Sequence, residues 1–463
     1  MEMSGLDQCL HGRMNAFQRV MYQWSDLHPY NAVHAYRIAR PLHAERLRES
    51  ICRVYRQVGC GFVETDAAGR WYRHEVDLDP PLEIVDGGHN VEAVLRDVFA
   101  RELNTPFARP RCRPMRFTAV AVGPADHYVC MGYNHWTADS VAARLLGRRI
   151  FNLYLNLGLA EEPPLELYPD TYREVFASKL GRLRVVRALG QAVGQMLWQR
   201  RICRAPYTAV THFPVGCAMA STADGAVDRL RHFARSLGAT VHDVMLAALA
   251  RAIVEHLPRR ATDGGFRPLA MGTIVDTRGD SEVDLSNTFG TFLSYYGVRF
   301  LAEPGTGLAE VTRRVAALTR PIKAQRAYLD ALPQMRLFSM AWPLLSQRRR
   351  AYYARLALPM TAGISNVVIR DPWLNAPGSP IVDYLRGSPT GPMLPLTAAV
   401  TTLGNRINIG LTYRQAGFTA SRLRAILGMF QEQLERPDRA DRSRLGSRVH
   451  ASPTAASRSS AAA

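Results

Sequence analysis

The sequence predicts a mixed α/β fold in which two halves of similar size each contain strands and helices. Two observations support this prediction. Short runs rich in β-branched and aromatic residues alternate with longer segments whose apolar residues recur at helical spacing. The 463 residues, 47% of them hydrophobic and 21% charged, are enough to bury more than one apolar core. This composition excludes a collagen, a coiled coil or a mainly disordered chain.

In the first half, each change from an extended run to helical periodicity marks a new element. Leu47, Ile51 and Val54 have helical spacing, and they follow an extended run that contains Val33 and Ile38. The expected elements are a strand and a helix within 30–57, a helix over 91–104, strands over 117–122 and 128–133 around a Gly-Pro turn, and a helix that Ser140 caps and that ends near Gly158.

The second half contains a clear signal for a helix start. Thr240 is followed three residues later by Asp243 and then by an apolar helical run, which is a capping box. The other expected elements are a buried strand over 269–275, helices over 308–330 and 333–356, a hairpin of 397–403 and 406–413 around the Gly404-Asn405 turn, and a last helix over 420–434.

The stretch 161–164, Glu-Glu-Pro-Pro, is the candidate connection between the halves, because two prolines cannot continue a helix. The chain beyond Arg436 is rich in Arg, Ser, Ala and Pro, a composition typical of disorder. We therefore expect an N-terminal subdomain over 1–165, a basic crossover segment over 166–210, a C-terminal subdomain over 211–435 and a disordered tail over 436–463.

The chain is strongly basic, with 58 Lys and Arg against 40 Asp and Glu and a formal net charge of +18. Only Lys179 and Lys323 are lysines, and such an arginine bias can reflect genome composition, so we do not interpret it as a nucleic-acid signal. The charge favours acidic carrier proteins, phosphate-bearing ligands or anionic lipid headgroups as partners. A nucleic-acid binder, which would need a basic groove with exposed aromatic residues, is the less favoured hypothesis.

The segment 177–206 has seven basic and no acidic residues, with apolar residues interspersed. It is compatible with an interfacial amphipathic helix and with a solvated basic helix packed on the body of the protein. The seven scattered cysteines contain no CxxC, no signal peptide is evident, and no apolar run approaches the ~20 residues that span a bilayer. We expect a cytoplasmic protein, with attachment to the inner face of a membrane as an open alternative.

The candidate site is the stretch 133–140, Tyr-Asn-His-Trp-Thr-Ala-Asp-Ser, where a strand ends and a helix begins. The positive end of that helix disfavours imidazolium, so His135 is expected to be a neutral proton acceptor. Asp139 is expected to orient the loop or to pair with an arginine. Two alternatives remain: a structural histidine at a strand end, and a zinc pair, for which the sequence shows no third ligand.

The H-x-x-x-D pattern and its position resemble the condensation-domain-like acyltransferases. These include condensation domains of nonribosomal peptide synthetases, bacterial wax ester synthases and polyketide-associated acyltransferases, all with the chloramphenicol acetyltransferase fold. The usual HHxxxDG is NHWTADS here. The resemblance covers roughly residues 15–435, and the further stretches that carry it are 29–33, 238–248, 275–278 and 364–367.

The resemblance implies a role for each matching residue. His135 would be the catalytic base, Asp139 a structural residue and Arg278 its ion-pair partner. Asn134 replaces the first histidine of the motif, and Ser140 replaces its closing glycine. The residues expected to line the channel are Asn134, Trp136, Ser140, Ser365 and Asn366.

The resemblance also implies an architecture and a reaction. Two acetyltransferase-like subdomains would form a V-shaped pseudo-dimer with His135 in a central tunnel. The chain would transfer an acyl group from acyl-CoA, or from an acyl carrier protein acting in trans, to a hydroxyl or amine of a small molecule or lipid. No metal or bound cofactor is implied, and no P-loop, dinucleotide or G-x-S-x-G motif is found. The alternative is a degenerate, non-catalytic scaffold that recruits carrier or synthetase partners.

Overall fold

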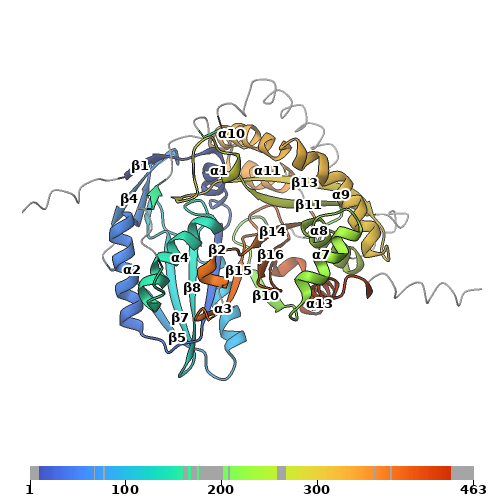
Figure 1. Ribbon diagram of the computed structural model, residues 1–463. Coiled ribbons are helices and arrows are strands. Elements are labelled where there is room, and N and C mark those ends of the chain that lie inside the picture. Colours follow the sequence, from blue (N-terminus) through green and yellow to red (C-terminus); the bar gives the residue numbers. More distant parts are fainter. Residues whose placement is uncertain are drawn as a thin grey trace, which may run out of the picture.

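A computed structural model describes residues 10–439 apart from 67, 77–78, 160–164, 168–174, 177–201, 207–208, 258–266, 358–359 and 376–377. It has a mixed α/β architecture, as expected, with two lobes that are each built around a β-sheet (Figure 1). Most of the expected tail, from residue 440 on, and most of the basic segment 177–206 lie outside the described residues.

The first lobe is a five-stranded sheet in the order β15-β2-β8-β7-β5. Helices α2 and α4 pack on one face, and α3 packs on the other, towards the second lobe. Its elements are β2 (Asn31–Ile38), α2 (Ala44–Val58), β5 (Leu82–Asp86), α3 (Val91–Asn104), β7 (Met115–Gly123), β8 (Asp126–Asn134), α4 (Ser140–Leu155) and β15 (Ile381–Gly387).

The second lobe is a six-stranded sheet in the order β10-β17-β16-β14-β11-β13, with helices packed on its outer face. Its elements are β10 (Val215–Ser221), α7 (Ala226–Ser236), α8 (Val241–His256), β11 (Arg267–Asp276), β13 (Leu293–Ala302), α9 (Leu308–Ala324), β14 (Ala362–Val368), β16 (Leu396–Leu403), β17 (Arg406–Arg414) and α13 (Ala420–Glu435).

Strand β16 shows why the inner face of this sheet is polar. Leu396, Ala398 and Val400 belong to the core under the helices. Because side chains alternate along a strand, Thr397 and Thr401 point the other way, towards the first lobe. The sheet therefore presents hydroxyl groups to the space between the lobes.

A third apolar cluster joins the lobes where α1 (Ala16–Trp24) packs on α10 (Ala331–Ala341). The remaining strands and α-helices in the described part of the chain are β1 (Leu10–Arg13), β3 (Gly61–Thr65), β4 (Trp71–Val76), β6 (Arg111–Cys112), β9 (Glu166–Leu167), β12 (Thr288–Phe289), α11 (Gln347–Ala357) and α12 (Pro372–Asn375).

Strand β15 connects the two lobes because it lies late in the chain but pairs antiparallel with β2 of the first sheet. The chain then returns to the second sheet as β16. The expected division into subdomains over 1–165 and 211–435 stays a prediction, but a strand from the second range completes the sheet of the first.

The crossing strand packs so closely on β17 that only glycine fits at residue 410. A Cβ added at Gly410 would lie 2.0 Å from the backbone oxygen of Arg386. We expect Gly410→Ala to lower the free energy of unfolding by about 2–3 kcal/mol in urea titrations, because backbone must move. The matched control is Gly428→Ala in α13, where an added Cβ meets no atom within 4 Å. This control should raise stability by about 0.5–1 kcal/mol. A loss in Gly410→Ala no larger than about 0.5 kcal/mol would contradict the close packing.

Most expected elements are confirmed, including the capping box at Thr240 and the hairpin around Gly404. Two expectations were wrong. The cap of α4 is Asp139, whose carboxylate accepts the backbone N–H groups of Val141 and Ala142, while Ser140 is the first helical residue.

The second error concerns the helices expected over 308–330 and 333–356. The first helix ends at residue 324. Arg326 has a left-handed backbone conformation, which interrupts the helical geometry before α10. The second is divided into α10 and α11 by a short 3-10 turn that contains Pro343. A proline lacks the N–H that would continue the helix. Among the described helices, no single one is long and apolar enough to span a membrane.

Candidate active site

The loop that carries the H-x-x-x-D pattern leaves β8 and enters α4, and both lobes hold its backbone. The His135 N–H donates to the Tyr30 carbonyl at 3.0 Å. From the second lobe, the Thr291 hydroxyl donates to the His135 and Trp136 carbonyls, both at 3.2 Å. The Asp139 N–H donates to the Gly290 carbonyl at 3.1 Å. The position of His135 is therefore fixed at the junction of the lobes.

Asp139 and Arg278 form a buried ion pair across this junction, as the resemblance implies. Arg278 Nη1 lies 2.6 Å from Asp139 Oδ2, and the two side chains are only 8% and 1% exposed. The same carboxylate accepts the Phe292 N–H at 2.9 Å. Burial acts to raise the pKa of Asp139, but Arg278 and the backbone donors outweigh it, so the pKa is lowered. Asp139 is therefore a carboxylate that clamps the loop.

His135 is a neutral imidazole. Burial lowers its pKa below the usual 6.5, and nearby backbone carbonyls and Asp139 oppose this shift only in part. Its Nδ1 is buried and makes no hydrogen bond to the described residues. A neutral ring that lines a cavity can accept a proton from a ligand.

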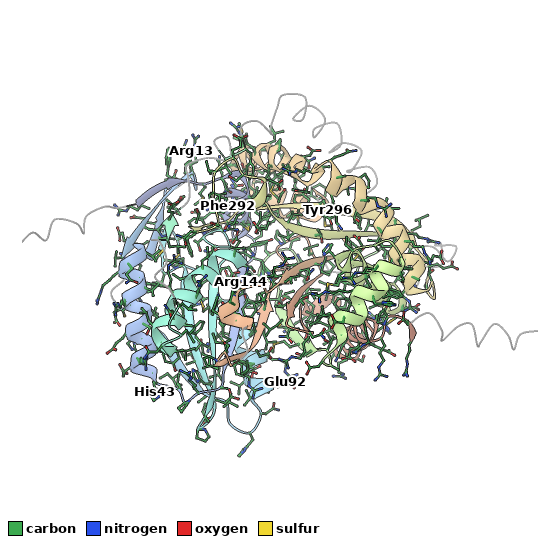
Figure 2. All side chains as sticks on the ribbon, in the orientation of Figure 1. Arg13, His43, Glu92, Arg144, Phe292 and Tyr296 are labelled. Atoms are coloured by element: carbon green, nitrogen blue, oxygen red, sulfur yellow. The ribbon has the colours of Figure 1, made fainter. Side chains whose placement is uncertain are left out.

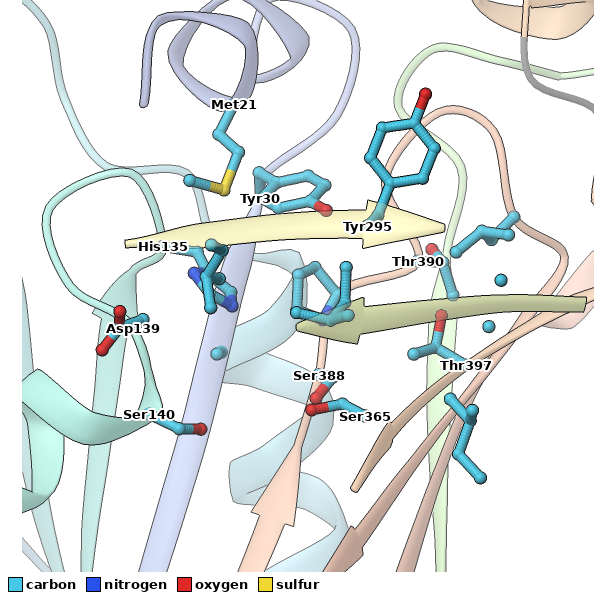
Figure 3. A pocket seen from close by; sticks show the side chains of 18 of the residues that line it. Met21, Tyr30, His135, Asp139, Ser140, Tyr295, Ser365, Ser388, Thr390 and Thr397 are labelled. Atoms are coloured by element: carbon cyan, nitrogen blue, oxygen red, sulfur yellow. The ribbon is translucent and has the colours of Figure 1, made fainter. Parts of the chain in front are cut away.

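A cavity of about 150 Å³ lies between the lobes and reaches His135 (Figure 3). Its apolar lining includes Phe17, Met21 and Trp24 of α1 and Met335 of α10. Its polar lining comes largely from the inner face of the second sheet and the loop after β15. The polar lining residues on that side include Thr273, Ser365, Asn366, Ser388, Thr390 and Thr397.

Five of the expected site residues line this cavity: His135, Asp139, Ser140, Ser365 and Asn366. Arg278 supports the site through its ion pair with Asp139.

Asn134 and Trp136 are not among the residues that line the cavity, so the expectation for these two was wrong. Trp136 is 2% exposed and packs against Tyr22 and Tyr72, with ring centroids 5.7 and 6.1 Å apart. Asn134 is buried at the end of β8, opposite Asn31 of β2. Alternation along β8 explains the position of Asn134, because its neighbour Tyr133 lines the cavity and successive side chains of a strand point to opposite faces.

Sequence reasoning missed His34, which lines the same cavity from β2. Its Nδ1 lies 2.9 Å from the Tyr384 hydroxyl, and its Nε2 lies 3.1 Å from the Tyr133 hydroxyl and 3.3 Å from Ser140 Oγ. Burial lowers its pKa well below 6.5, and Arg386 and Arg144 add to the shift. His34 is therefore a weak base, held neutral in a hydrogen-bond network.

Sequence reasoning also missed Arg386 and Arg144. Arg386 belongs to β15 and is 2% exposed. Arg144 belongs to α4 and lies near the middle of the molecule (Figure 2), where its Nε donates to Asp371 at 3.1 Å. No local sequence pattern identifies either residue as part of the site, because their burial depends on the strand that crosses between the lobes.

No protein-family model matches the chain, and no curated protein is similar to it by sequence. Solved structures are similar over nearly its full length. The first condensation domain of the calcium-dependent antibiotic synthetase, in complex with a substrate analogue, has a TM-score of 0.67 at 17% identity, over 92% of this chain and 96% of that chain. The trichothecene 15-O-acetyltransferase TRI3 from Fusarium sporotrichioides has a TM-score of 0.65 at 12% identity, over 94% and 97%.

Polyketide synthase associated protein 5 from Mycobacterium tuberculosis is also similar, with a TM-score of 0.60 at 13% identity over 93% of this chain and 100% of that chain. These similarities show that the chain has the condensation-domain fold, which confirms the expected fold class.

Proposed function

We propose that the protein transfers an acyl group from a thioester to a hydroxyl or amine, with His135 as the general base. One observation carries the proposal: His135 is neutral, is fixed by both lobes and opens into a cavity between them. The similar solved structures include a condensation domain and an acetyltransferase, which supports the same reaction class.

In the proposed reaction, His135 takes a proton from the acceptor while the acceptor's oxygen or nitrogen attacks the thioester carbonyl carbon. The C–S bond then breaks, and the imidazolium returns the proton to the leaving thiolate. The histidine thus ends the cycle neutral. Asp139 and Arg278 keep the loop in place, because their ion pair joins the two lobes beside it. The Ser140 N–H is the proposed donor to the oxyanion, because the N–H groups of Val141 and Ala142 already donate to Asp139.

The proposed donors are acyl-CoA and a phosphopantetheine-linked acyl group on a carrier protein acting in trans. The formal charge of +18 supports either donor, because both are anionic. The acceptor is a small molecule or a lipid, and the proposed location is the cytoplasm, where a basic surface also permits contact with a membrane.

The proposal is tested by a panel of acyl-CoAs and acyl carrier proteins with alcohol and amine acceptors. Thiol release and the mass of the product are measured together, and reactions without an acceptor serve as the control for hydrolysis. We expect a product that contains the acyl group and the acceptor. The competing function is a non-catalytic scaffold, which the cavity reaching His135 does not favour. Tight binding of a carrier protein without turnover of any donor would contradict acyl transfer and favour the scaffold.

A further inference from the structure

Arg386 is a buried cation without a carboxylate partner in the described part of the chain. Its Nε donates to Thr401 Oγ1 at 2.8 Å, and its Nη2 donates to the carbonyls of Val400 at 2.8 Å and Ser365 at 3.0 Å. Its Nη1 donates to Ser140 Oγ at 3.0 Å. Every one of these acceptors is neutral, so the hydrogen bonds satisfy the guanidinium but leave its charge uncompensated.

Such a charge is expensive to bury, and its surroundings do not reduce the cost. Burial lowers the pKa of Arg386, and neighbouring Arg144 acts in the same direction. Arg144 has its own carboxylate in Asp371, and the groups that favour a charged Arg386 are tyrosine hydroxyls. The described residues therefore leave the positive charge of Arg386 without a carboxylate in contact. The cavity lining also contains Asp276, but this carboxylate lies beside Arg278, 3.3 Å from its Nη1.

Two serine hydroxyls connect this charge to the cavity. Arg386 Nη1 lies 3.0 Å from Ser140 Oγ and 3.4 Å from Ser365 Oγ, and both serines line the cavity. A hydroxyl that accepts a hydrogen bond from a cation still has its own proton to donate, and its donor strength is increased. His34 can accept from Tyr133 at 3.1 Å, which leaves the Ser140 proton available to a ligand.

A third hydroxyl on the same wall has no hydrogen bond to any described residue. Thr397 lines the cavity, is 6% exposed, and its Oγ1 is buried without a partner. Gly363 is its register partner on β14, and Ser365 lies two residues further along that strand, on the same face. Figure 3 shows Ser140, Ser365 and Thr397 around one space. A buried hydroxyl without a partner indicates that a ligand atom completes its hydrogen bonds.

We propose that the cavity binds a substrate that carries a carboxylate, and that this carboxylate sits against the hydroxyls of Ser140 and Ser365 in front of Arg386. The two serines donate hydrogen bonds to the carboxylate, and the carboxylate supplies the negative counter-charge that Arg386 lacks among the described residues. This inference rests on the proposed acyl transfer, because it assigns a negative charge to one substrate of that reaction. Binding of the carboxylate can still be measured without turnover.

The test measures binding to His135→Ala protein by ligand-observed NMR titration, with hexanoate, hexanamide and hexylamine as probes of similar shape. We expect hexanoate to bind at least about tenfold more tightly than hexanamide, and hexylamine to bind most weakly. The preference should persist when salt is raised from about 0.15 to about 0.5 M, because a buried charge is poorly screened. A preference that disappears at high salt would reflect the basic surface and would overturn the inference.

Two further variants in the same His135→Ala background show which residues cause the preference for hexanoate. Ser140→Ala/Ser365→Ala keeps the guanidinium and should reduce the hexanoate preference about tenfold. Arg386→Met should abolish the preference. Arg251→Met is the matched control, because Arg251 is also buried, at 8% exposure, but lies in the second lobe on Gln433. It should leave the preference unchanged.

Equal binding of hexanoate and hexanamide would overturn the inference, as would a preference that survives in both cavity variants. A hexanoate preference, together with a wild-type protein that transfers no acyl group, would support this site and contradict the proposed function. Acyl transfer by the wild type without a hexanoate preference would support the proposed function and contradict this site. A serine variant that lowers kcat in protein with His135 intact, but keeps the hexanoate preference in the His135→Ala background, would assign the hydroxyls to the transition state and overturn the carboxylate site.

Discussion

Replacing His135 with alanine should reduce acyl transfer by about 10²- to 10⁴-fold, the range expected when a general base is removed. The ring lines the cavity and is neutral, and removing it takes away the only proton acceptor that we assign to the reaction. The fold should be retained, because the loop is held by backbone hydrogen bonds at residues 135 and 136 rather than by the imidazole. Steady-state rates with the best donor and acceptor of the panel test this expectation.

The matched control is His34→Ala, because His34 lines the same cavity but is a weak base surrounded by hydrogen-bond partners. It should reduce the rate far less than His135→Ala.

The pH profile gives a second readout of the role of His135. Since burial lowers the pKa of His135 below 6.5, the base stays active above that lowered pKa. With an alcohol acceptor, the acid limb of kcat/KM should therefore lie below pH 6.5. Equal activity of wild type and His135→Ala would show that another group is the base.

The sequence was sufficient for the elements whose signals are local. The capping box at Thr240 and the hairpin turn at Gly404 are each determined by a few neighbouring residues, and both were found. Helix ends near Arg326 and Pro343 were missed, because periodicity continues through them while the backbone changes direction.

The candidate site shows the same division. His135 and Asp139 are found from one short stretch, and the partner Arg278 could be named only through the family resemblance. His34 and Arg386 could not be found, because β2 and β15 are paired although they are separated by more than 340 residues. Long-range strand pairing decides which of their side chains reach the cavity, and no local pattern encodes it.

Replacing Asp139 with alanine should lower the free energy of unfolding by about 3–5 kcal/mol, the range for breaking a buried ion pair. The variant leaves the Arg278 guanidinium buried with Asp276 at 3.3 Å, a residue whose own side chain is 45% exposed. It also removes the acceptor of the Phe292 N–H and the cap of α4. Loss of the cap alone would account for only about 1 kcal/mol. Urea titration of the whole chain measures the difference.

The control for Asp139→Ala is Asp228→Ala. The Asp228 carboxylate pairs with Arg231 at 3.2 Å, but its side chain is 66% exposed, so its loss should lower the free energy of unfolding by less than about 1 kcal/mol.

The pH dependence of the stability identifies the charge of Asp139 as the cause. Because the pKa of Asp139 is lowered in the folded state, the unfolded chain takes up this proton first as pH falls. The stabilisation is complete well above the unfolded pKa of about 3.9 and is lost as pH falls through the lower folded pKa. The difference between wild type and Asp139→Asn should therefore be constant from about pH 8 to 5 and shrink below about pH 4. A difference that does not change with pH would assign the stability to packing and hydrogen bonds instead of the ion pair.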